Sequence, residues 1–183
     1  SYEHDGGETT SDEFTYQASD GEKGTGTVTV SITINPINDV PVGASESISL
    51  AEGATATMLV GGESSVLAND TDGEDEPLTA VLVTPPAYDA DFASNFQTDG
   101  TFSYQHDGSE TTSDSFTYRA DDGTDQSDIV TVSIAIATSN DQPTVSTIDD
   151  LIWAEDEATT EIDLTVYFDD EESSPSGLIY TIE

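Results

Sequence analysis

The chain has 183 residues, and 39 Asp and Glu residues against 2 Lys and Arg residues give a formal net charge of −37. So acidic a chain excludes nucleic acids as partners and argues against anionic membrane surfaces, because both are bound through clustered Lys and Arg. The lack of cysteine excludes disulfides, zinc–thiolate sites and cysteine nucleophiles. Carboxylates at this density repel one another in a compact state, so we expect divalent cations to stabilise the fold.

A long internal repeat organises the chain from its first residue. Residues 1–21 and 103–123 are identical at 16 of 21 positions, at an offset of 102. The same register reaches Asn38-Asp39-Val40-Pro41 and Asn140-Asp141-Gln142-Pro143. A period of about 100 residues is too long for a solenoid or a propeller blade and fits tandem immunoglobulin-sized sandwiches. The repeat therefore predicts an all-β fold of Ig-like Greek-key β-sandwich repeats.

This repeat predicts five segments along the chain. They are the end of one repeat (1–37), a linker (38–42), a complete repeat (43–138), a second linker (139–143) and the start of a further repeat (144–183). Only the complete repeat is long enough to bury a sandwich core. The flanking pieces are either parts of a longer array or halves that neighbouring chains complete, and we favour the first explanation.

Local patterns predict β-strands and no helix. Apolar and polar residues alternate from Val28 to Ile34, for example, which is the period of a half-buried strand. Thr and Val, which favour strands, are abundant throughout. In the complete repeat we expect strands at 46–50, 54–60, 78–84, 90–96, 100–105, 114–120 and 128–136.

Antiparallel alternation of these strands brings acidic residues to both linkers. At the first linker we expect an oxygen-only metal site formed by Glu8, Asp12, Asn38, Asp39, Asp70, Asp72 and Asp122. At the second linker the candidates are Glu52, Asp107, Glu110, Asp114, Asn140, Asp141, Asp169 and Glu171. Calcium takes 6–8 oxygen ligands in flexible geometry, whereas zinc prefers Cys and His. The sequence therefore predicts Ca²⁺ at both linkers.

Four motifs give the chain a family resemblance. They are the two Asn-Asp-x-Pro linkers, Asp70-Thr71-Asp72, Ala120-Asp121-Asp122-Gly123, and Glu52 after the first strand. Together they resemble the cadherin family, and more closely the bacterial cadherin-like and dystroglycan-type repeats of large surface proteins. The resemblance covers essentially the whole chain and implies that calcium binds between repeats and stiffens the array. Two departures are a linker shorter by one residue and Glu171 in place of the second Asp of Asp-x-Asp.

These patterns predict a structural function. We expect a calcium-rigidified extender or adhesion scaffold of a secreted or bacterial cell-surface adhesin or extracellular filament, with neighbouring repeats or copies of the same protein as partners. We do not expect an enzyme, because His4 and His106 recur with the scaffold and no Gly-x-Ser-x-Gly motif occurs. The alternative is a calcium-dependent polysaccharide-binding module in which Tyr88 and Trp153 stack on sugars, although packing is the simpler role for both.

Overall fold

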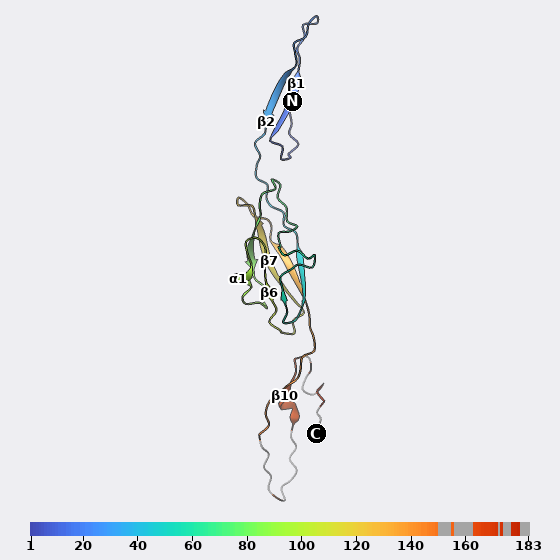
Figure 1. Ribbon diagram of the computed structural model, residues 1–183, viewed down its shortest axis with the longest axis vertical. Helices are drawn as coiled ribbons and strands as arrows, with labels where there is room; N and C mark the ends of the chain where they lie inside the picture. The colour runs from blue at the N-terminus through green and yellow to red at the C-terminus, as the bar shows by residue number, and fades with distance from the viewer. Residues whose placement is uncertain (150–154, 156–162, 172, 174–176, 180–183) are drawn as a thin grey trace.

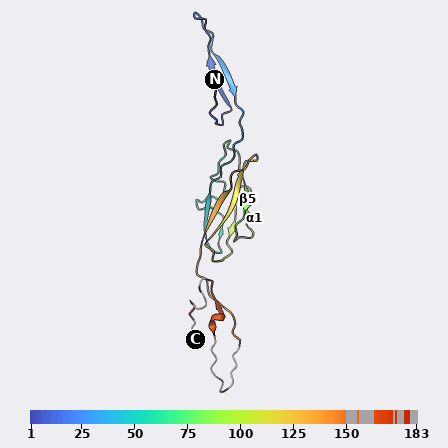
Figure 2. The same ribbon diagram turned by 180° about the vertical axis from the view of Figure 1, so that it is seen from behind.

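The computed structural model is elongated, with the complete repeat at its centre (Figures 1 and 2). An N-terminal hairpin lies at one end and a C-terminal piece at the other. None of the helices in the described part of the chain is long and apolar enough to cross a membrane. The structure describes residues 1–149, 155, 163–171, 173 and 177–179.

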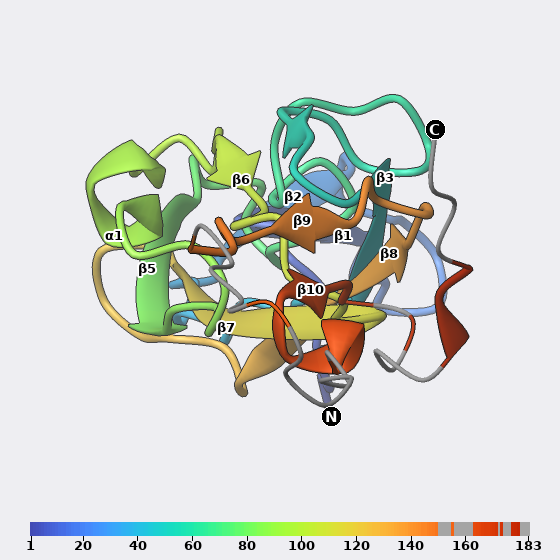
Figure 3. The ribbon, with the colours of Figure 1, turned by 90° about the horizontal axis from the view of Figure 1, so that it is seen from below.

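The central repeat is built on a four-stranded sheet in the order β3-β8-β7-β5. Strand β3 runs parallel to β8, whereas β7 pairs antiparallel with both β8 and β5. Figure 3, viewed along the long axis, shows β5 and β8 on either side of β7. The bounds are β3 (Glu46–Ala51), β5 (Thr79–Thr84), β7 (Ser113–Asp121) and β8 (Val130–Ala137), and a smaller sheet joins β4 (Thr55–Ala56) to β6 (Tyr104–Gln105).

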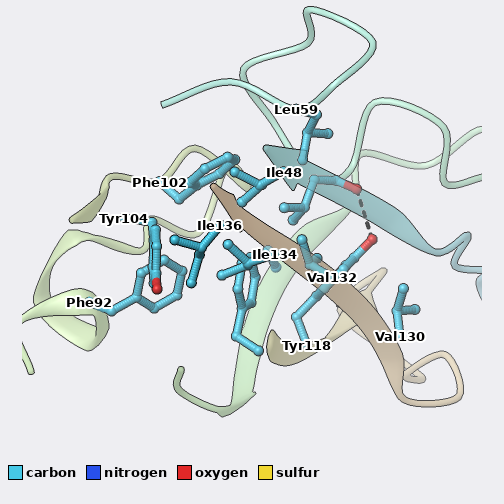
Figure 4. Close-up of a cluster of buried hydrophobic side chains, with 13 residues drawn as sticks. Ile48, Leu59, Phe92, Phe102, Tyr104, Tyr118, Val130, Val132, Ile134 and Ile136 are labelled. Carbon is cyan, nitrogen blue, oxygen red and sulfur yellow. Dashed lines mark hydrogen bonds between the residues drawn. The ribbon is translucent and has the colours of Figure 1, made fainter. Parts of the chain in front are cut away.

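One hydrophobic core lies inside this repeat (Figure 4). Alternate residues of β7 and β8 point into it, as the period of two along each strand predicts. The ring of Phe116 is fully buried and lies 4.6 Å from that of Phe92 and 6.1 Å from that of Phe102, between ring centroids. Each buried aromatic side chain contributes about 1.5–3 kcal/mol of hydrophobic stabilisation.

The prediction of a strand at 90–96 is wrong, because this segment contains the short helix α1 (Phe92–Asn95). Phe92 and Phe96 are four residues apart, so one helical turn brings their rings onto the same side, 5.8 Å apart between centroids. The Phe96 N–H donates to the Phe92 carbonyl at 2.9 Å and closes the turn. Packing of both rings against Phe116 therefore outweighs the local preference for a strand.

Two other predicted strands are shorter than expected. Within the segment 54–60, only β4 is a strand, because the Leu59 N–H donates to the Glu63 carbonyl at 2.8 Å and the chain turns into a loop. The segment 100–105 keeps only β6, and its first residue, Gly100, has φ +80°. A Cβ at Gly100 would clash with the Ser65 hydroxyl oxygen, so the loop requires glycine there.

The flanking pieces are smaller. The N-terminal hairpin pairs β1 (Ser11–Tyr16) with β2 (Val28–Thr33), and in the C-terminal piece β9 (Thr144–Val145) pairs with β10 (Phe168–Asp169), after the 3-10 helix η1 (Leu164–Val166). None of the six residues of β1 is buried. Only the central repeat has a hydrophobic core among the described residues.

Candidate metal sites at the two linkers

The first cluster of acidic side chains lies where the N-terminal hairpin meets the central repeat. Glu8, Asp39 and Glu74 each place one carboxylate oxygen within 4.8 Å of the others. Glu8 lies in the loop before β1, Asp39 in the linker, and Glu74 in the loop that leads to β5. We call this set the first cluster; it draws on the hairpin, the linker and the central repeat.

The carboxylates of the first cluster repel one another. Desolvation, together with the charges of Glu74 and Asp39, raises the pKa of Glu8. The Asp39 N–H donates to both carboxylate oxygens of Glu74 at 3.2 Å, which draws the loop to the linker. A Cβ at Gly73 would lie 2.9 Å from Asp39 Oδ2, so glycine leaves room for that approach. A cation between the three groups would relieve the repulsion.

The two acids of the Asp-x-Asp motif have different hydrogen-bond partners. Asp70 accepts hydrogen bonds from the Ala44 N–H at 2.7 Å and the Tyr118 hydroxyl at 2.9 Å, and burial raises its pKa. Asp72 Oδ1 accepts the N–H groups of Glu74 and Glu76 at 3.1 and 3.3 Å. Its other oxygen, Oδ2, is buried and has no hydrogen-bond partner in the structure, so it is available to a ligand.

Asn38 ties the linker to the loop between β7 and β8. Its side-chain amide donates to Asp122 Oδ2 at 3.1 Å and to Asp125 Oδ2 at 3.2 Å. Backbone N–H groups of that loop lower the pKa of Asp122, so it stays charged. Asp12 is exposed on β1 and lies outside the first cluster.

The second cluster lies where the central repeat meets the next linker. Glu52, Glu110 and Asp141 each place one carboxylate oxygen within 4.8 Å of the others. Glu52 Oε1 accepts from the Ser139 N–H at 2.8 Å and the Ser139 hydroxyl at 2.5 Å, and these bonds lower the pKa of Glu52. Glu52 Oε2 is buried without a hydrogen-bond partner in the structure. All three acids are among those that the sequence predicts for this linker.

A buried histidine holds the loops that carry the second cluster. His106 Nδ1 accepts the N–H groups of Gly53 and Gly108 at 3.2 and 3.3 Å, so Nε2 carries the proton and donates to the Thr111 hydroxyl at 2.8 Å. The ring of Tyr88 lies 6.1 Å from the His106 ring and is partly buried. His106 therefore has a structural role, joining the loop after β3 to the loop after β6.

Several predicted ligands lie outside both clusters. Asp114 accepts from the N–H groups of Ala87 and Tyr88 and from the Tyr104 hydroxyl, so it fastens the loop before α1. Asp107 Oδ1 accepts the Ser109 N–H, and the Asn140 amide donates to the Asp141 carbonyl. Asp169 pairs with Thr144 in the β9–β10 ladder and Glu171 is exposed, while Trp153 lies outside the described residues. As ligands, these residues stay predictions.

The sequence interpretation missed Glu74. The available signal was its place two residues after the Asp-x-Asp motif, beyond a glycine. Both clusters consist of carboxylates, and each linker also has a buried carboxylate oxygen without a hydrogen-bond partner, on Asp72 and Glu52 respectively. Such a donor set fits calcium, which prefers charged oxygen ligands, better than zinc.

Comparison with known proteins gives the family. The family model described as the bacterial cadherin-like domain matches residues 38–138, more than half of the chain, so the chain belongs to this family. The predictions of a cadherin-like family and an all-β sandwich are thereby confirmed. Domains of this kind are extracellular adhesion-type modules.

Individual relatives extend far beyond this chain. The human extracellular matrix organizing protein FRAS1 is 34% identical over 129 residues, which cover 62% of this chain and 3% of that protein. Extracellular cadherin domains 1–4 of protocadherin gamma B7 align with a TM-score of 0.47 and 19% identity, over 78% of this chain and 36% of that one. A cis-dimer structure of protocadherin gammaB7 EC3-6 aligns with a TM-score of 0.46 and 16% identity, over 75% of this chain and 36% of that one.

Proposed function

We propose that the chain is a calcium-rigidified extender of an extracellular adhesin or filament. The observation that carries this proposal is the presence, at each linker, of three carboxylate oxygens within 4.8 Å of one another. The linkers are the places where bending between repeats is easiest. A divalent ion there neutralises the repulsion and turns the same acids into a bridge.

Calcium also stabilises the folded state in this proposal. With a formal charge of −37, the chain is opposed by its own carboxylates when it is compact. An ion that binds only the native form adds about 2.7 kcal/mol at a free concentration one hundred times its dissociation constant. Stiffness and stability therefore both depend on calcium.

The extracellular setting draws support from the family and its relatives. The family is described as bacterial, which favours a bacterial cell surface, and the human relative is named for organising extracellular matrix. Neighbouring repeats of the same protein are the partners that the two linkers imply. The whole protein then acts as a spacer, in which each linker fixes the angle between adjacent sandwiches.

Calcium titration of chelator-treated protein tests this function. We expect saturable binding by calorimetry and, in small-angle X-ray scattering, a change from a flexible to an extended rigid particle. Magnesium at equal concentration is the control, because its strict octahedral geometry and tightly held water suit these flexible clusters less well. A scattering profile that calcium leaves unchanged, with no heat of binding, would contradict the proposal.

A further inference from the structure

The outer face of the four-stranded sheet has no net charge, although the whole chain carries −37. The residues that point away from the core are the odd-numbered ones of β3, β5, β7 and β8, all in the described part of the chain. We call this set the outer face. Its members are Ser, Thr, Ala and Val, apart from Arg119 and Asp121, whose charges cancel.

Exposed apolar side chains surround this neutral surface. On β5, Val81 and Val83 are 39% and 42% exposed. Ile129 is 52% exposed and lies beside Arg119, because the preceding residue pair of the two strands joins Tyr118 to Val130. At the other edge of the sheet, the N–H of the exposed Val60 donates to the Ser47 carbonyl at 2.9 Å. Apolar residues grouped on an uncharged face are typical of an interaction surface.

The acids of the central repeat lie on its other sides. Helix α1 is across the core from the outer face, because the ring of Phe92 packs against the inward-pointing ring of Phe116. On that side, Asp89, Asp91 and Asp107 line one pocket. Further acids gather in the two clusters at the linkers. An acidic partner is therefore repelled from these sides and can approach the outer face.

We propose that the outer face is where two copies of this chain pack sheet against sheet. A second copy is as acidic as the first, so the two can meet only where neither partner presents net charge. A two-fold axis brings the outer face of one copy onto that of the other, which supplies the neutral surface twice. The short side chains let the sheets approach to about 10 Å. A cationic partner would instead be drawn to the acidic sides.

The size of the outer face sets the strength of this contact. Four strands about 4.8 Å apart, each about six residues long at about 3.4 Å per residue, cover about 400 Å² on each copy. The total of about 800 Å² is below the ~1,200 Å² of stable interfaces, so one repeat gives a weak, reversible dimer. Several repeats side by side would bind far more tightly through the same contact.

Sedimentation equilibrium of the full chain tests the proposal, in chelator and over a range of sodium chloride concentrations. We expect a weak dimer whose association strengthens with salt, because salt screens the long-range repulsion between copies and leaves the uncharged contact intact. Calcium is absent from this experiment, so its outcome is independent of the proposed calcium function. A chain that stays monomeric at every salt concentration would overturn the inference.

Ser133→Lys separates a contact through the outer face from general repulsion. Ser133 is exposed on β8, one of the two inner strands of the sheet, and the change makes the chain less negative. Repulsion alone predicts stronger association. We expect association at least about tenfold weaker, because a charged side chain from each copy stands in the contact. Ser133→Asp should weaken it as well, and circular dichroism checks that both variants fold.

Ser94→Asp is the matched control, because it adds the same charge as Ser133→Asp at an exposed position of α1, across the core. It should associate like the parent. Association that Ser133→Lys leaves unchanged or strengthens would refute the role of the outer face. So would loss of the dimer in Phe14→Asp together with its retention in Ser133→Lys, since this result would place the contact on the exposed face of the N-terminal hairpin.

Discussion

The hairpins β1–β2 and β7–β8 have nearly the same sequence and the same pairing, yet they bury their side chains very differently. Phe14 lies opposite Val30 in the first hairpin, as Phe116 lies opposite Val132 in the second. Phe14 is 50% exposed, whereas Phe116 is fully buried. The local sequence therefore sets the strands, their register and their apolar face, but it does not bury that face.

Burial comes from residues distant in the sequence. In the central repeat, β3 covers the free edge of β8 and β5 covers that of β7. The rings of Phe92 and Phe102 close over Phe116. All these partners lie in residues 42–102, and no described residue plays their part for β1–β2. The comparison shows that the segment 42–102 is what converts a hairpin into a sandwich.

The largest expected effect comes from supplying this segment to the first hairpin. A copy of residues 42–102 placed directly before Ser1 restores the order found in the central repeat, since residue 103 is the counterpart of Ser1. We expect Phe14 and Tyr16 to become buried in a second sandwich. The amides of β1 and β2 should then exchange hydrogen only through global opening, which costs about 5 kcal/mol or more for a folded domain.

The same extended chain with Phe14→Asp is the control for this experiment. It keeps the length and the added strands but places a charge in the new core, which is strongly unfavourable. Its β1 and β2 amides should exchange as fast as those of the original chain. Equal exchange in all three chains would show that residues 42–102 do not suffice to complete the hairpin.

A smaller effect should follow from truncating equivalent aromatic residues. Phe116→Ala removes a fully buried ring that packs against Phe92, so we expect the central repeat to lose about 3–5 kcal/mol. Phe14→Ala removes a half-exposed ring, and it should change the stability of the same repeat by less than about 0.5 kcal/mol. Urea unfolding followed by circular dichroism measures both, and similar losses in the two variants would contradict the comparison.

The success of sequence-based prediction follows the same division between local and distant contacts. Strands β3, β5, β7 and β8 could be predicted because alternation is a local signal. Helix α1 could not, because it depends on Phe92 and Phe96 packing against Phe116, which is distant in sequence. Similarly, Asp114 was predicted as a ligand at the second linker, but it accepts hydrogen bonds from Ala87 and Tyr88, in a loop whose path no local pattern reveals.

The candidate sites show this limit too. Alternating strand direction was enough to expect Glu52, Glu110 and Asp141 at one linker, because it sets the end of the sandwich at which each turn lies. Glu74 required the shape of one loop, which hydrogen bonds to Asp72 determine. The domain boundaries at 37/38 and 138/139 stay predictions, although the family match ends at residue 138.

The smallest expected effect is a difference in how pH controls the proposed calcium binding at the two clusters. Desolvation and neighbouring charges raise the pKa of Glu8, whereas hydrogen bonds from Ser139 lower that of Glu52. A raised pKa in the folded chain means that a proton competes with calcium at higher pH. Affinity at the first cluster should therefore fall first as pH decreases from 7 toward 5, by at most about tenfold per pH unit for one bound proton.

Calcium titrations at pH 7, 6 and 5 measure this difference. Glu52→Gln weakens the second cluster and so reports on the first, and Glu74→Gln weakens the first cluster and so reports on the second.

In the calcium-free chain, the raised pKa of Glu8 means that its charged form opposes folding: the stability of the fold is highest below the pKa of Glu8 in the unfolded chain and falls as pH rises through its pKa in the folded chain. In the proposed function, bound calcium offsets this cost at neutral pH. Glu8→Gln should remove both the pH dependence and the cost, and earlier calcium loss from the second cluster would show that Ser139 does not keep Glu52 charged.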